Sequence, residues 1–373
     1  MTREQSPIIL RCSYSDEASW LPKEKCALIC DDGQTLLDGY GAYIVAESDK
    51  AKYSDDPYIV AIPGGCESGD FLRVERTDEG CSITRLLTAD RPDRTLFMTE
   101  QCNSNCIMCP YSSRQRSNGQ PTRTEELIQF VELMDPEAEY LCITGGEPTL
   151  LKDGFLTVLS AVKAHLPYAL VHILTNGRTF YYQDFFKAYQ AVRPYQTLLG
   201  IPLHASDETL HDSIAGAPGS FRQTIKGLDH CYAGGEHIEL RIVTSRLNLL
   251  NLPDLAEYIS AHYPAVSHVS LMGLEMMGNA MINRQDVWVS FDELMPVMEQ
   301  VVDILLSHGV AVRLFNYPLC KVSPKYQALY YRSISEYKIR YKPECDDCTK
   351  KMECGGFFQT TIVMPDINVT PHC

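Results

Sequence analysis

Three cysteines lie close together near the end of the first third of the chain, and their spacing can do chemistry. Cys102, Cys106 and Cys109 form a C-x3-C-x2-C segment directly after an apolar run, residues 95–99, that has the pattern of a buried strand. Three thiolates on one short loop can ligate three irons of a cubane [4Fe-4S] cluster and leave the fourth iron free to bind a substrate or cofactor. A zinc knuckle completed by a distant residue, or three unrelated buried cysteines, are the alternatives that the spacing leaves open.

A second set of cysteines lies near the end of the chain. Cys345, Cys348 and Cys354 are spaced C-x2-C-x5-C, and Cys320 precedes them. Four thiolates can fully ligate one zinc ion or one further [4Fe-4S] cluster, and the spacing does not separate these two. The chain has 15 cysteines. Because disulfides rarely persist in the cytosol, a cytosolic chain so rich in cysteine favours metal binding.

Composition and charge exclude several classes of protein. The 373 residues include 48 acidic and 33 basic side chains, for a net charge of -15, which repels phosphate backbones; we therefore expect no nucleic-acid partner. No stretch reaches the ~18 uninterrupted apolar residues of a membrane span, and the N-terminus lacks the apolar core of a signal peptide. We expect a cytoplasmic protein without membrane contact and with two or three domains.

The distribution of apolar runs predicts three regions. Residues 1–92 contain short strand-like runs separated by turn signals, which indicates a small β-rich domain. Residues 93–316 alternate buried apolar runs with amphipathic stretches, as expected of parallel strands covered by helices. Residues 317–373 are polar and carry the second cysteine set, so we expect a C-terminal extension with an auxiliary metal centre.

The middle region predicts six strand-helix repeats. The expected strands are 95–99, 140–144, 171–175, 198–203, 238–243 and 268–273, and the expected helices are 124–134, 154–165, 181–192, 221–233, 252–262 and 291–308. Such repeats indicate a partial or full α/β barrel, with an open doubly wound sheet as the alternative. In a barrel the carboxyl ends of the strands carry the chemistry, and the unusual residues of this region fall there.

The cysteine trio, in MTEQCNSNCIMCP, resembles the signature of the radical S-adenosylmethionine (SAM) superfamily. Further segments resemble that family's motifs, in the same order, over about residues 95–275. The resemblance implies a partial (β/α)6 barrel, a [4Fe-4S] cluster held by the trio, and SAM bound at the fourth iron. It also implies that an electron from the cluster splits SAM into methionine and a 5'-deoxyadenosyl radical, which takes a hydrogen atom from an unactivated C-H bond.

The segment TGGEPT, residues 144–149, resembles the family's GGEP motif, which contacts the amino group of SAM. Independently of that resemblance, Gly145 and Gly146 allow close approach of the backbone to a ligand, and Glu147 offers an acceptor for an ammonium group. A plain strand-to-helix turn would need the glycines but not Glu147.

Residues at the ends of the later strands are further candidates for contacts with SAM. In chain order they are Thr175, Asn176, His204, Ser206, Arg241, Met272 and Gly273. The resemblance places the first two after the third strand, His204 or Ser206 near the ribose or carboxylate, and the last two along the adenine. For Thr175 and Asn176 a plain turn is the alternative, and for Met272 the alternative is packing in the core. An arginine inside a barrel requires an anionic partner, and the SAM carboxylate is one of several.

The match extends beyond the general motifs. From about residue 68 onward the chain, including NYPLC and the terminal PECDDC-x5-CGGFF, resembles the HxsC family of radical SAM maturases, from the His-Xaa-Ser system. That resemblance implies modification of a ribosomally made peptide or small protein with His-Xaa-Ser repeats. It implies as partners a second radical SAM maturase and an electron donor such as flavodoxin or ferredoxin.

Peptide-modifying members of the superfamily often carry auxiliary clusters in domains called SPASM or twitch. This favours a second [4Fe-4S] cluster over zinc at the C-terminal cysteines, and the absence of the usual seven-cysteine SPASM pattern limits the region to one such cluster. Two other classes of protein stay open. A radical SAM enzyme acting on a small molecule or nucleotide would not need the second cysteine set, and a non-catalytic protein binding iron-sulfur clusters or zinc would not need Glu147.

Overall fold

The computed structural model describes residues 8–14, 20–30, 37–45, 59–62, 65–77, 80–87, 94–119 and 122–372. These residues form an eight-stranded sheet, a six-stranded sheet and a two-stranded pair. No helix within these ranges combines the length and the apolar composition that crossing a lipid bilayer requires.

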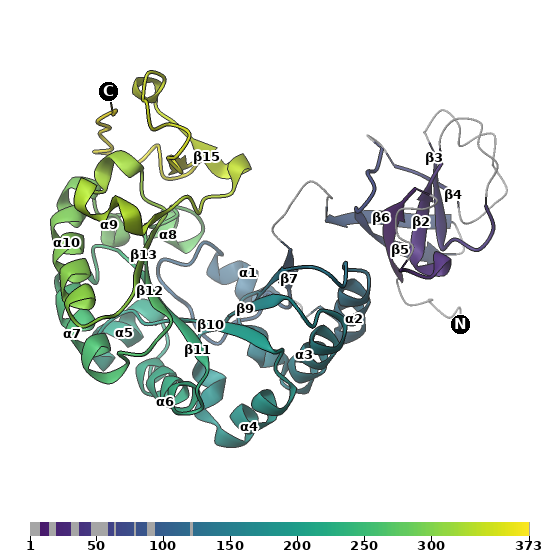
Figure 1. Cartoon of the computed structure of the whole chain (residues 1–373), viewed down its shortest axis with the longest axis horizontal. Helices are drawn as coiled ribbons and strands as arrows, with labels where there is room; N and C mark the ends of the chain where they lie inside the picture. The colour runs from purple at the N-terminus through teal and green to yellow at the C-terminus, as the bar shows by residue number, and fades with distance from the viewer. Residues whose placement is uncertain are drawn as a thin grey trace.

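The eight-stranded sheet is entirely parallel, in the order β14-β13-β12-β11-β10-β9-β8-β7. Its strands are β7 Thr95–Phe97, β8 Tyr140–Thr144, β9 Leu170–Leu174, β10 Gln196–Pro202, β11 His237–Val243, β12 His268–Met272, β13 Val312–Phe315 and β14 Tyr330–Tyr331. The sheet curves inside a ring of helices, and its edge strands β7 and β14 do not pair with each other (Figure 1). The expected partial barrel is therefore confirmed.

The helices of the barrel cover the outer face of this sheet (Figure 1). They are α2 Thr124–Glu132, α3 Asp153–His165, α4 Gln183–Val192, α6 Ser220–Ala233, α7 Leu252–His262 and α10 Phe291–Ser307, and they match the six expected helices to within a few residues. Four short helices were not expected, because fewer than three turns show little periodicity in sequence. They are α1 Ser113–Asn118, α5 Glu208–Ala215, α8 Asn279–Ile282 and α9 Arg284–Val287.

Side chains alternate between the two faces of each barrel strand. In β8, Leu141 and Ile143 are fully buried, whereas Cys142 between them is half-buried and Tyr140 at the strand start is exposed. The Tyr140 hydroxyl lies 3.2 Å from Nδ1 of His172 on the neighbouring strand β9. Because successive strand residues point to opposite faces, the apolar set packs under the helices and the polar set lines the interior of the barrel.

The six-stranded sheet lies at the N-terminal end of the chain. Its strands, in the order β4-β3-β2-β1-β5-β6, are β1 Ile8–Ser13, β2 Cys26–Ile29, β3 Ala42–Val45, β4 Ile59–Ala61, β5 Phe71–Thr77 and β6 Gly80–Leu87. The expected β-rich region is confirmed. Residues 78–79, between β5 and β6 in the chain, lie outside the described residues.

This N-terminal sheet packs against helix α2 of the barrel. The backbone N-H of Ile9 donates to Oε1 of Gln129 at 3.1 Å. The rings of Phe71 and Phe130 lie 4.7 Å apart between centroids, and both side chains are buried. The contact therefore joins the sheet to the first strand-helix unit of the barrel, which also carries the cysteine trio.

The C-terminal region continues from the barrel. Strand β14 extends the eight-stranded sheet, and β15 Ile339–Arg340 then pairs antiparallel with β16 Phe357–Phe358. Three of the four C-terminal cysteines lie within residues 341–356, between β15 and β16. The region thus reaches back to the barrel through β14.

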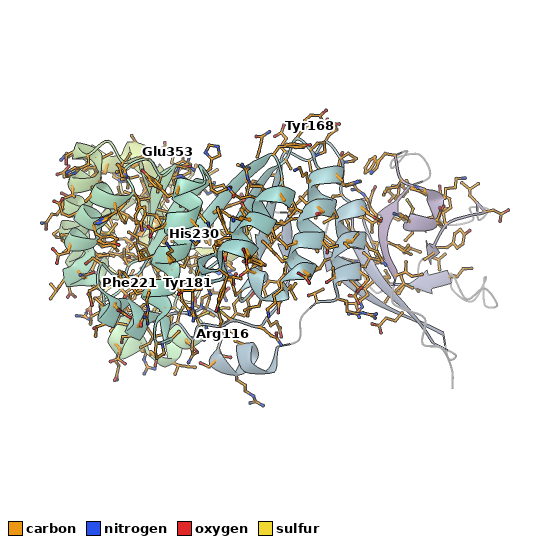
Figure 2. All side chains as sticks on the ribbon, turned by 90° about the horizontal axis from the view of Figure 1, so that it is seen from below. Arg116, Tyr168, Tyr181, Phe221, His230 and Glu353 are labelled. Atoms are coloured by element: carbon orange, nitrogen blue, oxygen red, sulfur yellow. The ribbon has the colours of Figure 1, made fainter. Side chains whose placement is uncertain are left out.

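We predict that Phe130→Ala will destabilise the protein. Removing a buried phenylalanine ring leaves a cavity and costs about 3 kcal/mol of the free energy of unfolding. Tyr168, at the upper edge of Figure 2, is 66% exposed, so Tyr168→Ala should change that free energy by less than about 0.5 kcal/mol. Urea denaturation of both variants measures the difference; equal midpoints would contradict the packing described for α2.

Candidate functional site

A cavity of about 390 Å³ opens at the carboxyl ends of the barrel strands. Its wall includes Thr144, Leu174, Pro202, Val243 and Met272, which lie at the ends of five consecutive strands. In parallel α/β barrels this end of the sheet is where binding and catalytic groups gather. The cavity is therefore the candidate site.

Most of the residues proposed from sequence lie on the wall of this cavity. They are Cys102, Cys106, Cys109, Gly145, Gly146, Thr175, Asn176, Arg241, Met272 and Gly273. These residues come from the loop after β7 and from the ends of β8, β9, β11 and β12. Fold topology thus brings together segments that are separated by up to 171 positions in the chain.

The three thiols of the first set share this wall. Burial raises the pKa of Cys102 to about 11 and that of Cys106 to about 12, and neighbouring cysteines add to the rise. The backbone N-H of Ser104 donates to Sγ of Cys102 at 3.4 Å. Thiolate is the form that ligates iron, so binding of a cluster would release protons from these buried groups.

Glycines allow the cysteine loop to lie directly against the end of β8. A Cβ atom on Gly145 would come within 2.5 Å of the carbonyl oxygen of Thr99, and one on Gly146 within 2.3 Å of that of Gln101. The N-H of Gly146 donates to Thr99 at 2.6 Å, and that of Glu147 donates to Gln101 at 2.8 Å. The two glycines therefore seat the start of the cysteine loop, in addition to lining the cavity.

Two other segments hold the far side of the cysteine loop. The N-H of Asn105 donates to the carbonyl of Ala215 at 2.9 Å, beside Gly216, which has a positive φ of 55°. Asn279 donates from its backbone to Cys109 at 2.9 Å and from its side chain to Cys106 at 3.0 Å, in both cases to the carbonyl oxygen. Sequence patterns alone did not identify these supporting residues.

Two arginines also bind the cysteine loop. Arg178 donates to the carbonyl oxygen of Asn103 and, at 2.9 Å, to the hydroxyl of Ser104. Arg116, on α1, donates to the carbonyl oxygen of Ser104 at 3.1 Å and to the side chain of Asn105. Arg116 also lines the cavity and is only 7% exposed. Neither arginine lies in a segment that the sequence analysis identified as a motif.

Glu147 lies behind the cavity wall and is fully buried. Its Oε1 accepts hydrogen bonds from the hydroxyls of Thr149 and Thr175 at 2.6 and 2.7 Å and from the N-H of Thr149 at 3.0 Å. Its Oε2 accepts the N-H of Asn176 at 2.6 Å. Burial raises the pKa of Glu147, and these four donors oppose the rise. In this arrangement the carboxylate ties the end of β9 to the end of β8.

His204 and Ser206 are also placed away from the cavity wall. His204 is 4% exposed, its backbone N-H lies 3.3 Å from Nδ1 of His211, and burial lowers its pKa to about 3. Ser206 is paired with Asn251 through two hydrogen bonds of 2.9 Å. From the same strand end, Pro202 reaches the cavity instead. The cavity wall therefore includes Pro202 of this strand end but neither His204 nor Ser206, and their contacts with SAM stay a prediction.

Arg241 has an anionic partner within the barrel. Its Nη1 lies 3.1 Å from both carboxylate oxygens of Glu239, which is buried. Burial raises the pKa of Glu239, but His172 and His268, whose Nε2 atoms lie 2.6 and 3.8 Å from its carboxylate, and the charge of Arg241 outweigh burial and hold that pKa well below its usual range. The side chain of Arg241 thus reaches the cavity with its charge already paired.

The second cysteine set surrounds its own small cavity, of about 20 Å³. Cys320, Cys345, Cys348 and Cys354 all line it, as their spacing predicted. The backbone N-H groups of Leu319 and Gly356 both donate to Sγ of Cys354 at 3.3 Å. Over the described parts of the chain, no three His, Cys, Asp or Glu side chains are grouped as a site for a single metal ion.

Adjacent residues of β16 connect the two cysteine sets. Phe357 lines the small cavity of the second set, and Phe358 lines the large cavity of the first. Glu275, also on the large cavity, lies 3.1 Å from Nζ of Lys338 in the C-terminal region. The C-terminal region therefore completes one side of the candidate site.

Comparison with known proteins identifies the barrel. Residues 96–259 match the radical SAM superfamily. This chain contains a radical SAM domain. The match of residues 96–259 agrees with the superfamily expected from the sequence, and the parallel sheet and partial barrel confirm the expected fold. The superfamily implies a [4Fe-4S] cluster and SAM as cofactors.

Curated relatives match over the same part of the chain. The mycofactocin maturase MftC of Mycobacterium tuberculosis is 26% identical over 221 residues, which cover 58% of this chain and 52% of MftC. The GTP 3',8-cyclase of Campylobacter jejuni is 26% identical over 57% of this chain and 64% of the cyclase. The antilisterial bacteriocin subtilosin biosynthesis protein AlbA of Bacillus subtilis is 24% identical over 44% of this chain and 36% of AlbA. The chain spans about half the length of MftC.

We predict that Gly146→Ala will displace the cysteine loop, because the new methyl group would overlap the backbone of Gln101. The expected result is a loss of at least about half of the iron bound at the first set after anaerobic reconstitution with iron and sulfide. Gly235→Ala is the matched control: its φ of 71° makes the alanine unfavourable by about 1 kcal/mol, but its methyl group would meet open space. Equal iron contents in the two variants would contradict the seating role of Gly146.

Proposed function

We propose that the protein is a radical SAM maturase that modifies a ribosomally synthesised peptide or small protein bearing His-Xaa-Ser repeats. One observation carries the proposal: the three thiols of Cys102, Cys106 and Cys109 share one cavity with the strand ends that resemble SAM-binding motifs. A protein that only stored a metal cluster would need the three thiols but not the strand ends that resemble SAM-binding motifs.

The residues present suit a three-thiolate cluster beside an organic cofactor. The donor set is three thiols on one braced loop, and the rest of the wall supplies glycine backbone, a threonine and an asparagine. When bound, the cluster and SAM together supply a 5'-deoxyadenosyl radical that removes a hydrogen atom from an unactivated C-H bond. The donors therefore match the cofactors that the superfamily implies.

The chain's own residues position the ligands. We propose that Gly145 and Gly146 present backbone groups to SAM, that Thr175 and Asn176 bind it at the end of β9, and that Met272 and Gly273 contact its adenine. Glu147 holds Thr175 and Asn176 in place through the hydrogen bonds described above, so we propose that it positions SAM indirectly, through these two neighbours. Arg241 extends the polar wall toward the interior. His204 and Ser206 lie off the wall, and their contacts with SAM stay a prediction.

The second cysteine set supports an auxiliary [4Fe-4S] cluster in this proposal. Four thiols meet at one cavity, and two backbone N-H groups donate to Cys354, an arrangement that tunes iron-sulfur clusters. Phe357 lines the cavity of the second cysteine set, and the next residue, Phe358, lines the cavity of the first set. An auxiliary cluster there could accept an electron from the substrate or brace the C-terminal region.

Several observations support a peptide substrate. The relatives named above include a maturase and a bacteriocin biosynthesis protein, and the C-terminal cysteine spacing resembles that of HxsC. The similarity to a GTP cyclase favours a second candidate function, a radical SAM reaction on a nucleotide. The net charge of -15 disfavours a phosphorylated substrate, so we place the peptide first. A second radical SAM maturase and a flavodoxin or ferredoxin are the proposed protein partners.

We predict that the first cysteine set alone is required for SAM cleavage. After anaerobic reconstitution the chain should bind about eight irons, and both Cys106→Ala and Cys354→Ala should lower that number by about four. Under reduction, Cys106→Ala should abolish 5'-deoxyadenosine formation, whereas Cys354→Ala should retain it. Cys231→Ala, which removes a buried thiol of the core, is the control. If the unmodified chain binds about four irons and one zinc instead, the second cysteine set holds zinc and the proposed auxiliary cluster is wrong.

We predict a mass change in a His-Xaa-Ser repeat peptide when that peptide is produced together with this chain and its partner maturase. The change should disappear with Cys106→Ala, and tandem mass spectrometry should locate it within the repeats. An unchanged peptide, together with consumption of GTP by the purified enzyme, would favour the nucleotide function instead.

A further inference from the structure

Three charged side chains lie on the wall of the cofactor cavity: Arg116, Arg241 and Glu275. The charges of the last two are paired. Arg241 lies 3.1 Å from Glu239, and Glu275 lies 3.1 Å from Lys338. Arg116 forms no ion pair with any carboxylate of the described residues. The cavity wall therefore contributes one uncompensated positive charge.

Arg116 is buried, and its hydrogen-bonding capacity is only partly used. Two of its nitrogens donate to Ser104 and Asn105, while its Nε is buried and meets no acceptor from the described residues. A guanidinium does not deprotonate in proteins. A buried cation without an anion is strongly unfavourable, so this site is built for a negatively charged ligand.

The position of Arg116 indicates which anion it serves. The residues that it binds, Ser104 and Asn105, lie between Cys102 and Cys106 in the loop. Three thiolates make the bound cluster negative, and reduction by one electron from an external donor adds a further negative charge. A fixed cation beside the ligands favours the more negative state, because cluster potentials respond to local charge.

We propose that Arg116 is a positioning residue that supplies the counter-charge for the iron-sulfur cluster at Cys102, Cys106 and Cys109 and makes its one-electron reduction easier. This inference rests on the proposed function, since it requires a cluster at these cysteines. It assigns Arg116 a role that neither Arg178 nor Arg241 can share. Arg178 binds the same loop but does not line the cofactor cavity, and Arg241 is already paired with Glu239.

The test is a redox titration of the first cluster without SAM. The background protein carries Cys345→Ala and Cys348→Ala, which leaves one cluster to observe by electron paramagnetic resonance. At the midpoint potential of that background, Arg116→Gln should lower the ratio of reduced to oxidised cluster about tenfold, which for one electron corresponds to about 59 mV. Arg116→Lys keeps the charge and should restore the ratio to within about threefold.

Arg178→Gln is the matched control. It removes an arginine from the same loop, so a shift caused merely by loosening the loop would appear in this variant as well. Equal shifts in Arg116→Gln and Arg178→Gln, or no shift in Arg116→Gln, would overturn the inference. So would a shift that appears only when SAM is added, because that result would assign the charge to the carboxylate of SAM.

Folding and the proposed function are checked separately. Circular dichroism of each variant before reconstitution shows whether it folds. If Arg116→Gln does not fold, Arg116→Lys is compared with the background protein instead. A ratio of reduced to oxidised cluster that falls about tenfold in Arg116→Lys, despite the retained charge, would overturn the inference. A background protein that binds no cluster would contradict the proposed function rather than the role of Arg116.

Discussion

The account depends on one constraint: a short loop must hold three thiols on one wall of a cavity. That loop is bound on every side by backbone groups. The end of β8 reaches it through Gly145 and Gly146, and Ala215 and Asn279 hold its far side. Because each of these contacts comes from a strand end or a following helix, the barrel itself fixes the arrangement of the cysteines. A ligand set that is already fixed in space loses little conformational entropy when metal binds.

The same design explains the polar residues around the loop. Glu147 is fully buried and accepts four hydrogen bonds, and the two from Thr175 and Asn176 join the ends of β8 and β9. Arg178 and Arg116 satisfy carbonyl groups of the loop that no regular secondary structure would reach. Polar side chains thus replace the backbone pairing that an irregular loop lacks, which is how such a loop can remain ordered beside a cavity.

Much of this site was predictable from the sequence, for physical reasons. The cysteines of the first set, and three of the four in the second, are close in the chain, so their spacing predicted that each set lies at one cavity. Buried strands are continuous apolar runs, and these located the strand ends. The direction of individual side chains was not predictable. Glu147 was expected to face the ligand but turns toward Thr149 and Thr175, and His204 lies off the wall. Arg116 lies on the short helix α1, which shows little periodicity in sequence, and only tertiary packing shows that it is buried.

The most direct test of the central claim is the response of the first cluster to SAM. The measurement is electron paramagnetic resonance of the reduced, anaerobically reconstituted chain in which Cys345 and Cys348 are replaced by alanine. If the three cysteines leave one iron free of protein ligands, adding SAM will change the spectrum of that cluster. An unchanged spectrum, or a fourth protein ligand detected on the cluster, would contradict the account.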